Sequence, residues 1–123
     1  MNRWYTRPVL FVSDLRRSLG FYIDLLGFAK DWHEADGQGK VCQISRDQLE
    51  VILCEDSSRR DKARLFVELN RDELAHLRAE IASRSIPARQ SWWGYDVIQI
   101  DDPDGNEWLF PLPTQEQQNG VAT

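Results

Sequence analysis

The chain repeats one order of elements in its two halves, and this repetition limits the fold more than any other feature of the sequence. Ser13 corresponds to Asn70 and Glu50 to Glu107, each 57 positions further on. The first pair precedes a helical pattern, and the second pair opens the last strand-like run of each half. A pattern that occurs only twice indicates a duplicated module rather than a solenoid.

The first half predicts one strand, one helix and three further strands. The first strand is expected at Val9–Val12. Ser13 is then expected to cap a helix, because apolar residues recur every three or four positions after it. Gly27 is expected to end this helix, since glycine tolerates the left-handed backbone that follows a helix. The further strands are expected at Phe28–Glu34, Val41–Ser45 and Leu49–Cys54, with a turn at 36–39.

The second half predicts the same order. A strand is expected at Arg64–Leu69, followed by a helix that Asn70 caps together with Glu73 in a capping box. The residues Asp102–Asn106 are typical of a tight turn, because proline presets φ and glycine supplies positive φ. The remaining strands are expected at Ala88–Trp92, Tyr95–Ile100 and Trp108–Phe110.

Two βαβββ modules predict an α+β fold, in which a curved mixed sheet forms a cup with the helices outside. At 123 residues one domain is expected. It spans residues 1–113, with the first module at 4–54, a polar linker at 55–63 and the second module at 64–113. The glutamine-rich tail, residues 114–123, is expected to be disordered.

Charge and composition exclude some classes of partner. The net charge of −5 argues against nucleic-acid binding and leaves cationic small molecules as partners. No apolar run approaches the roughly 18 residues of a membrane span. The N-terminus has no apolar signal-peptide region, so a cytoplasmic location is expected. Cys42 and Cys54 are therefore expected to be thiols that act as small hydrophobic residues.

Two motifs resemble those of the vicinal oxygen chelate superfamily. Residues 21–28 read FYIDLLGF, which is similar to the superfamily's FYxDxLGF segment, and Asp102–Asn106 matches its DPDGN hairpin. The superfamily includes glyoxalase I, extradiol dioxygenases, fosfomycin-resistance enzymes and bleomycin-resistance proteins. The resemblance covers roughly residues 5–112 and implies the cup-shaped fold. It says little about function, because function depends on the site rather than the fold.

The resemblance also implies four positions for metal ligands in the enzymes of the superfamily. In this chain they are Arg7, Ile52, Arg64 and Leu109. A guanidinium offers no lone pair to a metal, and the two aliphatic side chains have none. His33 and His76 lie outside these positions. We therefore expect no metal and no other cofactor.

The resemblance is closest to the metal-free bleomycin-resistance branch, whose members are dimers that sequester a cationic antibiotic. The spacing of residues 93–105 resembles the WGG…DPDG stretch of that branch. There the loop tryptophan stacks on the drug, which identifies Trp93 as the principal candidate. The implied function is antibiotic binding by a cytoplasmic homodimer, with an aromatic or cationic antibiotic-like molecule as ligand and no nucleic-acid or membrane partner.

Strand alternation completes the candidate site. If Arg7 and Arg64 face the cup, their strand neighbours two positions on face it as well. Trp108 and Phe110 then belong to the core, together with Leu10, Val12, Leu65, Val67 and Leu69. The ligand-binding candidates are Trp93, Tyr95, Trp32, Phe11, Phe66, Arg7, Arg64, Glu50, Glu68 and Glu107.

Several alternatives remain open at this point. Trp93 either contacts the ligand or anchors a loop or a dimer. Arg7 and Arg64 either pair with the nearby glutamates or clamp a carboxylate or phosphate. The alternative function is a glyoxalase- or dioxygenase-type metalloenzyme, a lyase or oxidoreductase with atypical ligands. Glu50, Glu68 or Glu107 would then supply acid–base chemistry. The occupied ligand positions make an enzyme the less favoured reading.

Overall fold

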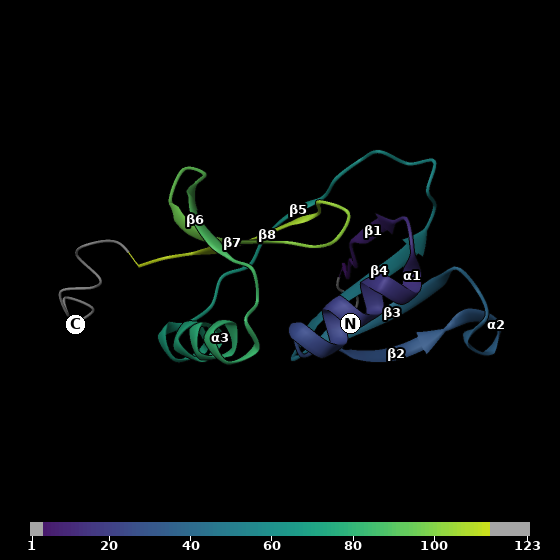
Figure 1. Ribbon diagram of the computed structural model, residues 1–123, viewed down its shortest axis with the longest axis horizontal. Coiled ribbons are helices and arrows are strands. Elements are labelled where there is room, and N and C mark those ends of the chain that lie inside the picture. The colour runs from purple at the N-terminus through teal and green to yellow at the C-terminus, as the bar shows by residue number, and fades with distance from the viewer. Residues whose placement is uncertain (1–3, 114–123) are drawn as a thin grey trace. The chain divides into compact units, whose positions relative to one another are not determined.

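A computed structural model describes residues 4–113 of the chain; the tail predicted at 114–123 lies outside the described residues. No helix in the described part is long and apolar enough to cross a membrane. The elements follow the predicted order in both halves (Figure 1). They are β1 (Val9–Val12), α1 (Leu15–Leu19), the π-helical segment η1 (Gly20–Leu25), β2 (Ala29–His33), α2 (Glu34–Gly37), β3 (Val41–Arg46), β4 (Leu49–Glu55), β5 (Arg64–Phe66), α3 (Arg71–Arg84), β6 (Arg89–Trp92), β7 (Asp96–Asp101) and β8 (Glu107–Pro111).

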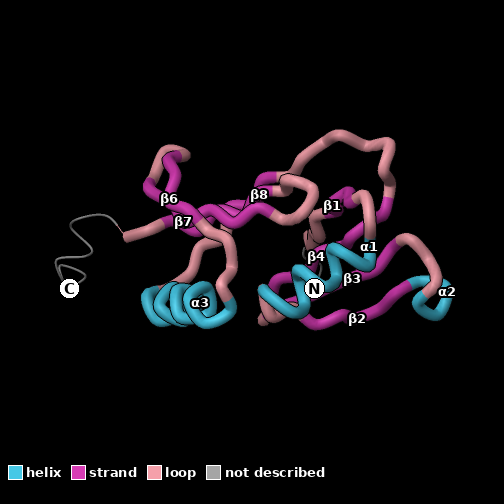
Figure 2. Tube along the Cα trace, viewed as in Figure 1, coloured by secondary structure: helices cyan, strands magenta, loops and turns pink. Residues whose placement is uncertain are grey.

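The strands form two four-stranded mixed sheets with identical topology (Figure 2). The strand order is β1-β4-β3-β2 in the first sheet and β5-β8-β7-β6 in the second. The pairs β1–β4 and β5–β8 are parallel, and the other neighbours are antiparallel. Each sheet belongs to its own βαβββ module, which confirms the predicted α+β fold and its duplication.

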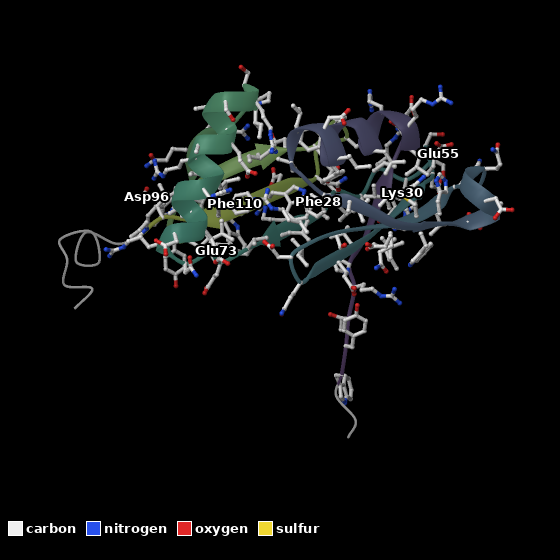
Figure 3. The ribbon with its side chains drawn as sticks, turned by 90° about the horizontal axis from the view of Figure 1, so that it is seen from below. Phe28, Lys30, Glu55, Glu73, Asp96 and Phe110 are labelled. Carbon is white, nitrogen blue, oxygen red and sulfur yellow. The ribbon has the colours of Figure 1, made fainter. Side chains whose placement is uncertain are left out.

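The first module buries one face of its sheet against α1 and η1. Leu10 and Val12 on β1 are each 1% exposed, as the alternation predicted. Tyr22 from η1 is fully buried and packs edge-on against Phe28, with ring centroids 5.5 Å apart. Burying each such side chain stabilises the fold by about 1.5–3 kcal/mol. Glu55 lies beside the start of α1 and accepts a hydrogen bond from the Leu15 amide at 2.9 Å (Figure 3).

The first helix differs from the prediction at its start. Asp14, not Ser13, is the N-cap, and its side chain accepts from the Arg17 amide at 3.2 Å. The Ser13 amide instead donates to the Asp104 carboxylate at 3.1 Å. The helix continues as η1 and ends before Gly27, whose φ of 73° is the left-handed conformation that the sequence predicted.

The second module confirms the predicted capping box. The Asn70 side chain accepts from the Glu73 amide, and the Glu73 side chain accepts from the Asn70 amide, each at 2.8 Å. Glu73 lies in the first turn of α3, which runs along one side of the second sheet (Figure 3). Trp108 and Phe110 are 1% and 8% exposed, which confirms their place in the core.

Several element ends differ from the sequence prediction. The strand predicted at Arg64–Leu69 ends at Phe66, although the Val67 amide still donates to the Leu109 carbonyl at 2.8 Å. The turn predicted at 36–39 overlaps α2, which is no regular helix because Ala35 and Asp36 have φ of 51° and 52°. These residues keep the character of a turn, since left-handed conformations do not propagate as a helix.

The chain divides into two compact units, which follow the modules with one exception. The first unit contains the described residues up to Ala63, so the linker predicted at 55–63 belongs to it. The Asp56 amide in this linker donates to the Val12 carbonyl at 2.9 Å. The exception is the turn Asp102–Asn106, which follows β7 in the sequence but belongs to the first unit. The assignment of residues 1–113 to a single domain stays a prediction.

Candidate functional site

An exposed cluster of three aromatic rings lies on the second module. The loop between β6 and β7 carries Trp93 and Tyr95, and Gly94 between them has a φ of 75°. The Trp93 amide donates to the Tyr95 carbonyl at 2.9 Å, which tightens the loop. The ring of Phe66 on β5 lies 5.5 Å from that of Trp93 and 5.9 Å from that of Tyr95, measured between centroids. Phe66, Trp93 and Tyr95 are called the aromatic cluster below.

The aromatic cluster joins the two outer strands of its sheet. Because β5 and β6 lie at opposite ends of the strand order, the loop after β6 meets β5 only if the second sheet is strongly curved. Trp93 is 48% exposed and Tyr95 is 54% exposed, so both rings remain open to solvent. Exposed aromatic groups that are held in place are typical of interaction sites.

Arg64 joins this cluster in two ways. Its Nε donates to a carboxylate oxygen of Glu107 at 2.6 Å, and its guanidinium carbon lies 5.5 Å from the centroid of the Trp93 ring. Of the two roles that the sequence left open, Arg64 therefore shows pairing with a glutamate, and it also contacts the principal candidate, Trp93. The pair is partly exposed, so it contributes at most about 1 kcal/mol to stability.

A second group of polar side chains lies on the same face of this sheet. Gln99 is 7% exposed; it accepts from the Ser91 hydroxyl at 2.8 Å and donates to Asp101 at 2.9 Å. Arg89 donates to the same aspartate at 3.0 Å. The register pairs Gln99 with Leu109 and Asp101 with Glu107, which places these residues on the face of Arg64 and Phe66.

The face of the first sheet that points away from α1 and η1, called the helix-distal face below, carries a different polar network. Its centre is Gln43, which is 5% exposed. The oxygen of its side chain accepts from Arg7 at 2.5 Å and from the Trp32 indole at 3.2 Å. Its nitrogen donates to Asp31 at 2.9 Å, and the Ser45 hydroxyl donates to the same carboxylate at 2.8 Å. A β-bulge between Lys30 and Trp32 lets both Asp31 and Trp32 reach this glutamine.

Phe11 on the same sheet has a cation above its ring. The guanidinium of Arg59 lies 3.9 Å from the Phe11 centroid and is paired with Asp61. Hydrogen bonds from Ser58 lower the pKa of Asp56 in this segment, and the bond to Asp61 raises the pKa of Arg59. The polar linker therefore contributes a side chain to the helix-distal face of its own module.

The predicted site residues thus fall into groups. The structure brings together Phe66, Trp93, Tyr95, Arg64 and Glu107 on the second module, and it joins Arg7 to Trp32 through Gln43 on the first. Glu68 is exposed and follows β5, and Glu50 lies on β4. The sequence reading missed Gln43 and Gln99. The sequence could have identified them by their position, because each glutamine alternates with core residues along its strand and therefore faces away from the core.

The residues at the metal positions of the superfamily do not fit a metal ion. Arg7 and Arg64 are engaged with Gln43 and Glu107, while Ile52 and Leu109 offer no donor atom. Within residues 4–113, no three histidine, cysteine, aspartate or glutamate side chains are grouped so that they could hold an ion. A catalytic site usually supplies at least three such ligands.

The two cysteines occupy opposite faces of the first sheet. Cys42 pairs with Leu53 in the register and is fully buried, whereas Cys54 pairs with Val41. Burial raises the pKa of the Cys42 thiol to about 11, and the charge of Lys30 opposes this shift. Cys42 is therefore a small hydrophobic residue of the core, as predicted.

The fold defines a class: proteins built from two βαβββ modules, each with a four-stranded mixed sheet. Residues 4–110 match the family model described as the Glyoxalase/Bleomycin resistance protein/Dioxygenase superfamily. The chain belongs to this superfamily, which confirms the resemblance carried by the two motifs.

Solved structures of the superfamily share the fold at low sequence identity. A bleomycin-binding protein complexed with bleomycin is 19% identical, with a TM-score of 0.69, covering 91% of this chain and 100% of that one. A lactoylglutathione lyase from Agrobacterium tumefaciens is 17% identical, with a TM-score of 0.65, covering 89% of this chain and 94% of that one. A fosfomycin resistance protein from Listeria monocytogenes is 16% identical, with a TM-score of 0.66, covering 96% of this chain and 98% of that one.

These three neighbours differ in what they bind or convert, so the similarity establishes the fold alone. A search of curated proteins finds no match. The function must therefore be argued from the side chains of this chain.

Proposed function

We propose that this chain is a small-molecule binding protein of the bleomycin-resistance type, which sequesters a planar aromatic or cationic antibiotic-like ligand. The observation that carries the proposal is the aromatic cluster. Two of its rings, Trp93 and Tyr95, are about half exposed while they contact Phe66 at 5.5 and 5.9 Å. The rings are held in place before any ligand arrives, which lowers the entropic cost of binding.

Stacking supplies the affinity in this proposal. A planar ligand that packs on Trp93 or Tyr95 gains about 0.5–1.5 kcal/mol per ring pair beyond the apolar area that it buries. A cationic ligand adds about 0.5–2 kcal/mol by attraction to the ring face. Arg64 already lies over Trp93 at 5.5 Å, so a cationic ligand must use the other ring face or displace this arginine.

A bleomycin-binding protein complexed with bleomycin shares this fold, so the fold is compatible with such a ligand. The metal-dependent alternative, a lyase or dioxygenase, is placed second because the four ligand positions do not fit an ion. A homodimeric assembly belongs to the proposal as a feature of the bleomycin-resistance branch, and a cytoplasmic location is proposed with it.

Metal-free bleomycin is the probe that tests the proposal. Isothermal titration calorimetry of the full chain should show saturable binding without added metal. Trp93→Ala should weaken this binding at least about tenfold, because it removes one stacking partner and its apolar area. Trp92→Ala is the matched control: Trp92 is adjacent and 71% exposed, but its register with Asp96 places it on the other face of the sheet.

Two outcomes would overturn the proposal. Equal affinity of the Trp93→Ala and Trp92→Ala variants would remove the aromatic cluster from the site. Absence of binding to metal-free bleomycin, together with stoichiometric binding of Ni²⁺, Mn²⁺ or Zn²⁺, would move the chain to the metalloenzyme alternative.

A further inference from the structure

The internal duplication presents the same pair of charged residues twice, in two different states. Arg64 and Glu107 on the second module form an ion pair at 2.6 Å. Arg7 and Glu50 stand at the same positions of the first module, 57 residues earlier. They do not form an ion pair, although their side chains have the same chemistry. The first module therefore lacks the ion pair that the second module forms at the equivalent positions.

The strand register confirms that the two pairs are equivalent. Arg64 lies directly beside Glu107 in the parallel ladder of β5 and β8. In the first module Val9 lies beside Ile52, and the Ile52 amide donates to the Pro8 carbonyl at 2.9 Å. This hydrogen bond extends the parallel ladder beyond β1. Arg7 lies two positions before Val9 and so shares its face of the sheet. It therefore stands beside Glu50 as Arg64 stands beside Glu107.

Arg7 is unavailable to Glu50 because the polar network around Gln43 binds it. Its guanidinium donates to the Gln43 oxygen at 2.5 Å and lies 5.6 Å from the centroid of the Tyr5 ring. Gln43 is itself fixed in orientation, since it donates to Asp31 and also accepts from Trp32. The arginine is thus bound to a neutral acceptor.

Glu50 is left without the partner that its position provides in the other module. One of its carboxylate oxygens is buried and accepts no hydrogen bond from residues 4–113. An ionised carboxylate is an acceptor only, and a buried acceptor without a donor costs free energy. Its cross-strand neighbour is Ser45, whereas Glu107 has Asp101 in that place. The Ser45 hydroxyl already donates to Asp31.

We propose that Glu50 is the recognition residue for a planar cationic group of the ligand, an amidinium or guanidinium. This group would take the place beside Glu50 that the Arg64 guanidinium takes beside Glu107. The inference rests on the proposed function only in that the ligand is a small molecule. A planar cation suits the site better than a metal ion, because no further carboxylate, histidine or cysteine within the described residues completes a metal site there.

A planar cation also suits this site better than an ammonium group. An amidinium presents two parallel N–H donors that match the two oxygens of one carboxylate. The exposed rings of Trp32 and Tyr5 belong to the same network and offer apolar contact to the rest of a flat ligand. The net charge of −5 favours the approach of a cation.

Benzamidine is the probe, and benzamide is its neutral analogue of nearly the same shape. Each is titrated into the ¹⁵N-labelled full chain, and binding is followed by the amide chemical shifts of Glu50 and Ser45. Benzamidine should shift these signals saturably and bind at least about tenfold more tightly than benzamide. Glu50→Gln should abolish this preference, because it removes the negative charge and keeps the shape.

Asp47→Asn is the matched control for the change of charge. Asp47 lies in the adjoining turn with a φ of 54°, a conformation that asparagine also accepts, and it is exposed. This variant should keep the full preference for benzamidine. An unchanged amide spectrum away from residue 50 establishes that Glu50→Gln is folded.

The outcomes separate this inference from the proposed function. The inference is overturned if benzamidine shows no advantage over benzamide, or if Glu50→Gln retains the advantage. A chain that prefers benzamidine through Glu50 but does not bind bleomycin would refute the proposed ligand type and leave the inference intact. Bleomycin binding through Trp93, without any role for Glu50, would refute the inference and leave the proposed function intact.

Discussion

The turn Asp102–Asn106 should stabilise the fold more than a surface turn does, because one buried carboxylate organises it. Asp102 is 4% exposed and accepts four hydrogen bonds. Two come from the amides of Asp104 and Asn106, at 2.9 and 2.8 Å. Two come from side chains, the Tyr22 hydroxyl and the Asn106 amide group, both at 2.8 Å. Tyr22 belongs to η1, so these bonds fasten the turn to the first unit.

The magnitude of the effect follows from these four bonds. A hydrogen bond to a charged group contributes about 1.5–3 kcal/mol, and the four bonds are not additive because they share two oxygens. We therefore expect Asp102→Ala to lower the free energy of unfolding by about 3–6 kcal/mol. This is a large part of the roughly 5–15 kcal/mol of a typical domain. Tyr22→Phe, which removes one donor, should lower it by about 1–2 kcal/mol.

Urea unfolding, followed by the fluorescence of the five tryptophans, measures both values. Asp96→Ala is the control, since Asp96 is an exposed carboxylate at the start of β7 and its loss should cost less than about 0.5 kcal/mol. In the Asp102→Ala background, Tyr22→Phe should cost less than it does alone. A loss below about 1 kcal/mol for Asp102→Ala, or strict additivity of the two changes, would refute this account of the turn.

Two further predictions concern stability. Asn70→Ala removes the side-chain acceptor that caps the Glu73 amide at the start of α3, and it should lower the free energy of unfolding by about 1 kcal/mol in urea. The Cys42 thiol should make stability fall as the pH rises from 9 to 11: the unfolded thiol ionises near 9.0 and the folded one near 11, so the unfolded state releases its proton first. The full effect is about 3 kcal/mol, and a Cys42→Ala variant that keeps the same slope would contradict it.

Local signals in the sequence were sufficient for most of the fold. The spacing of apolar residues and the pair Asn70 and Glu73 predicted α3, because a cap and an amphipathic stripe act within one helix. Gly27 ended the first helix as expected, since its left-handed backbone is a local requirement. The N-cap of α1 was misplaced by one residue because Ser13 and Asp14 both have the side-chain chemistry of a cap. The Ser13 amide instead donates a hydrogen bond to the carboxylate of Asp104, which is distant in sequence.

The candidate site was less accessible to sequence reasoning because it depends on contacts between distant strands. Alternation placed Phe66 and Arg64 on one face, and the register confirms this. It could not show that the β6–β7 loop brings Trp93 onto Phe66, because that contact depends on how strongly the sheet curves. Gln43 was missed because glutamine is usually exposed, whereas here its hydrogen bonds satisfy it in a buried position.

The two modules keep the same backbone register, although the number of residues between corresponding strands differs. Gln43 pairs with Ile52, and Gln99 pairs with Leu109, so the two glutamines are equivalent although they are 56 rather than 57 positions apart. The extra residue of the second module therefore lies in the turn between β7 and β8. Five residues separate Asp101 from Glu107, and this longer turn is the segment that the first unit holds through Asp102.

The equivalent glutamines then show how a duplicated backbone acquires two different chemistries. Gln99 bonds to Asp101 and Ser91, which leaves Arg64 free to pair with Glu107. Gln43 binds Arg7, which leaves Glu50 without its cation. The difference requires no change in strand register, only a change in the acceptor that each arginine meets. A duplicated module can therefore keep its fold while one copy closes an ion pair internally and the other presents the carboxylate to a ligand.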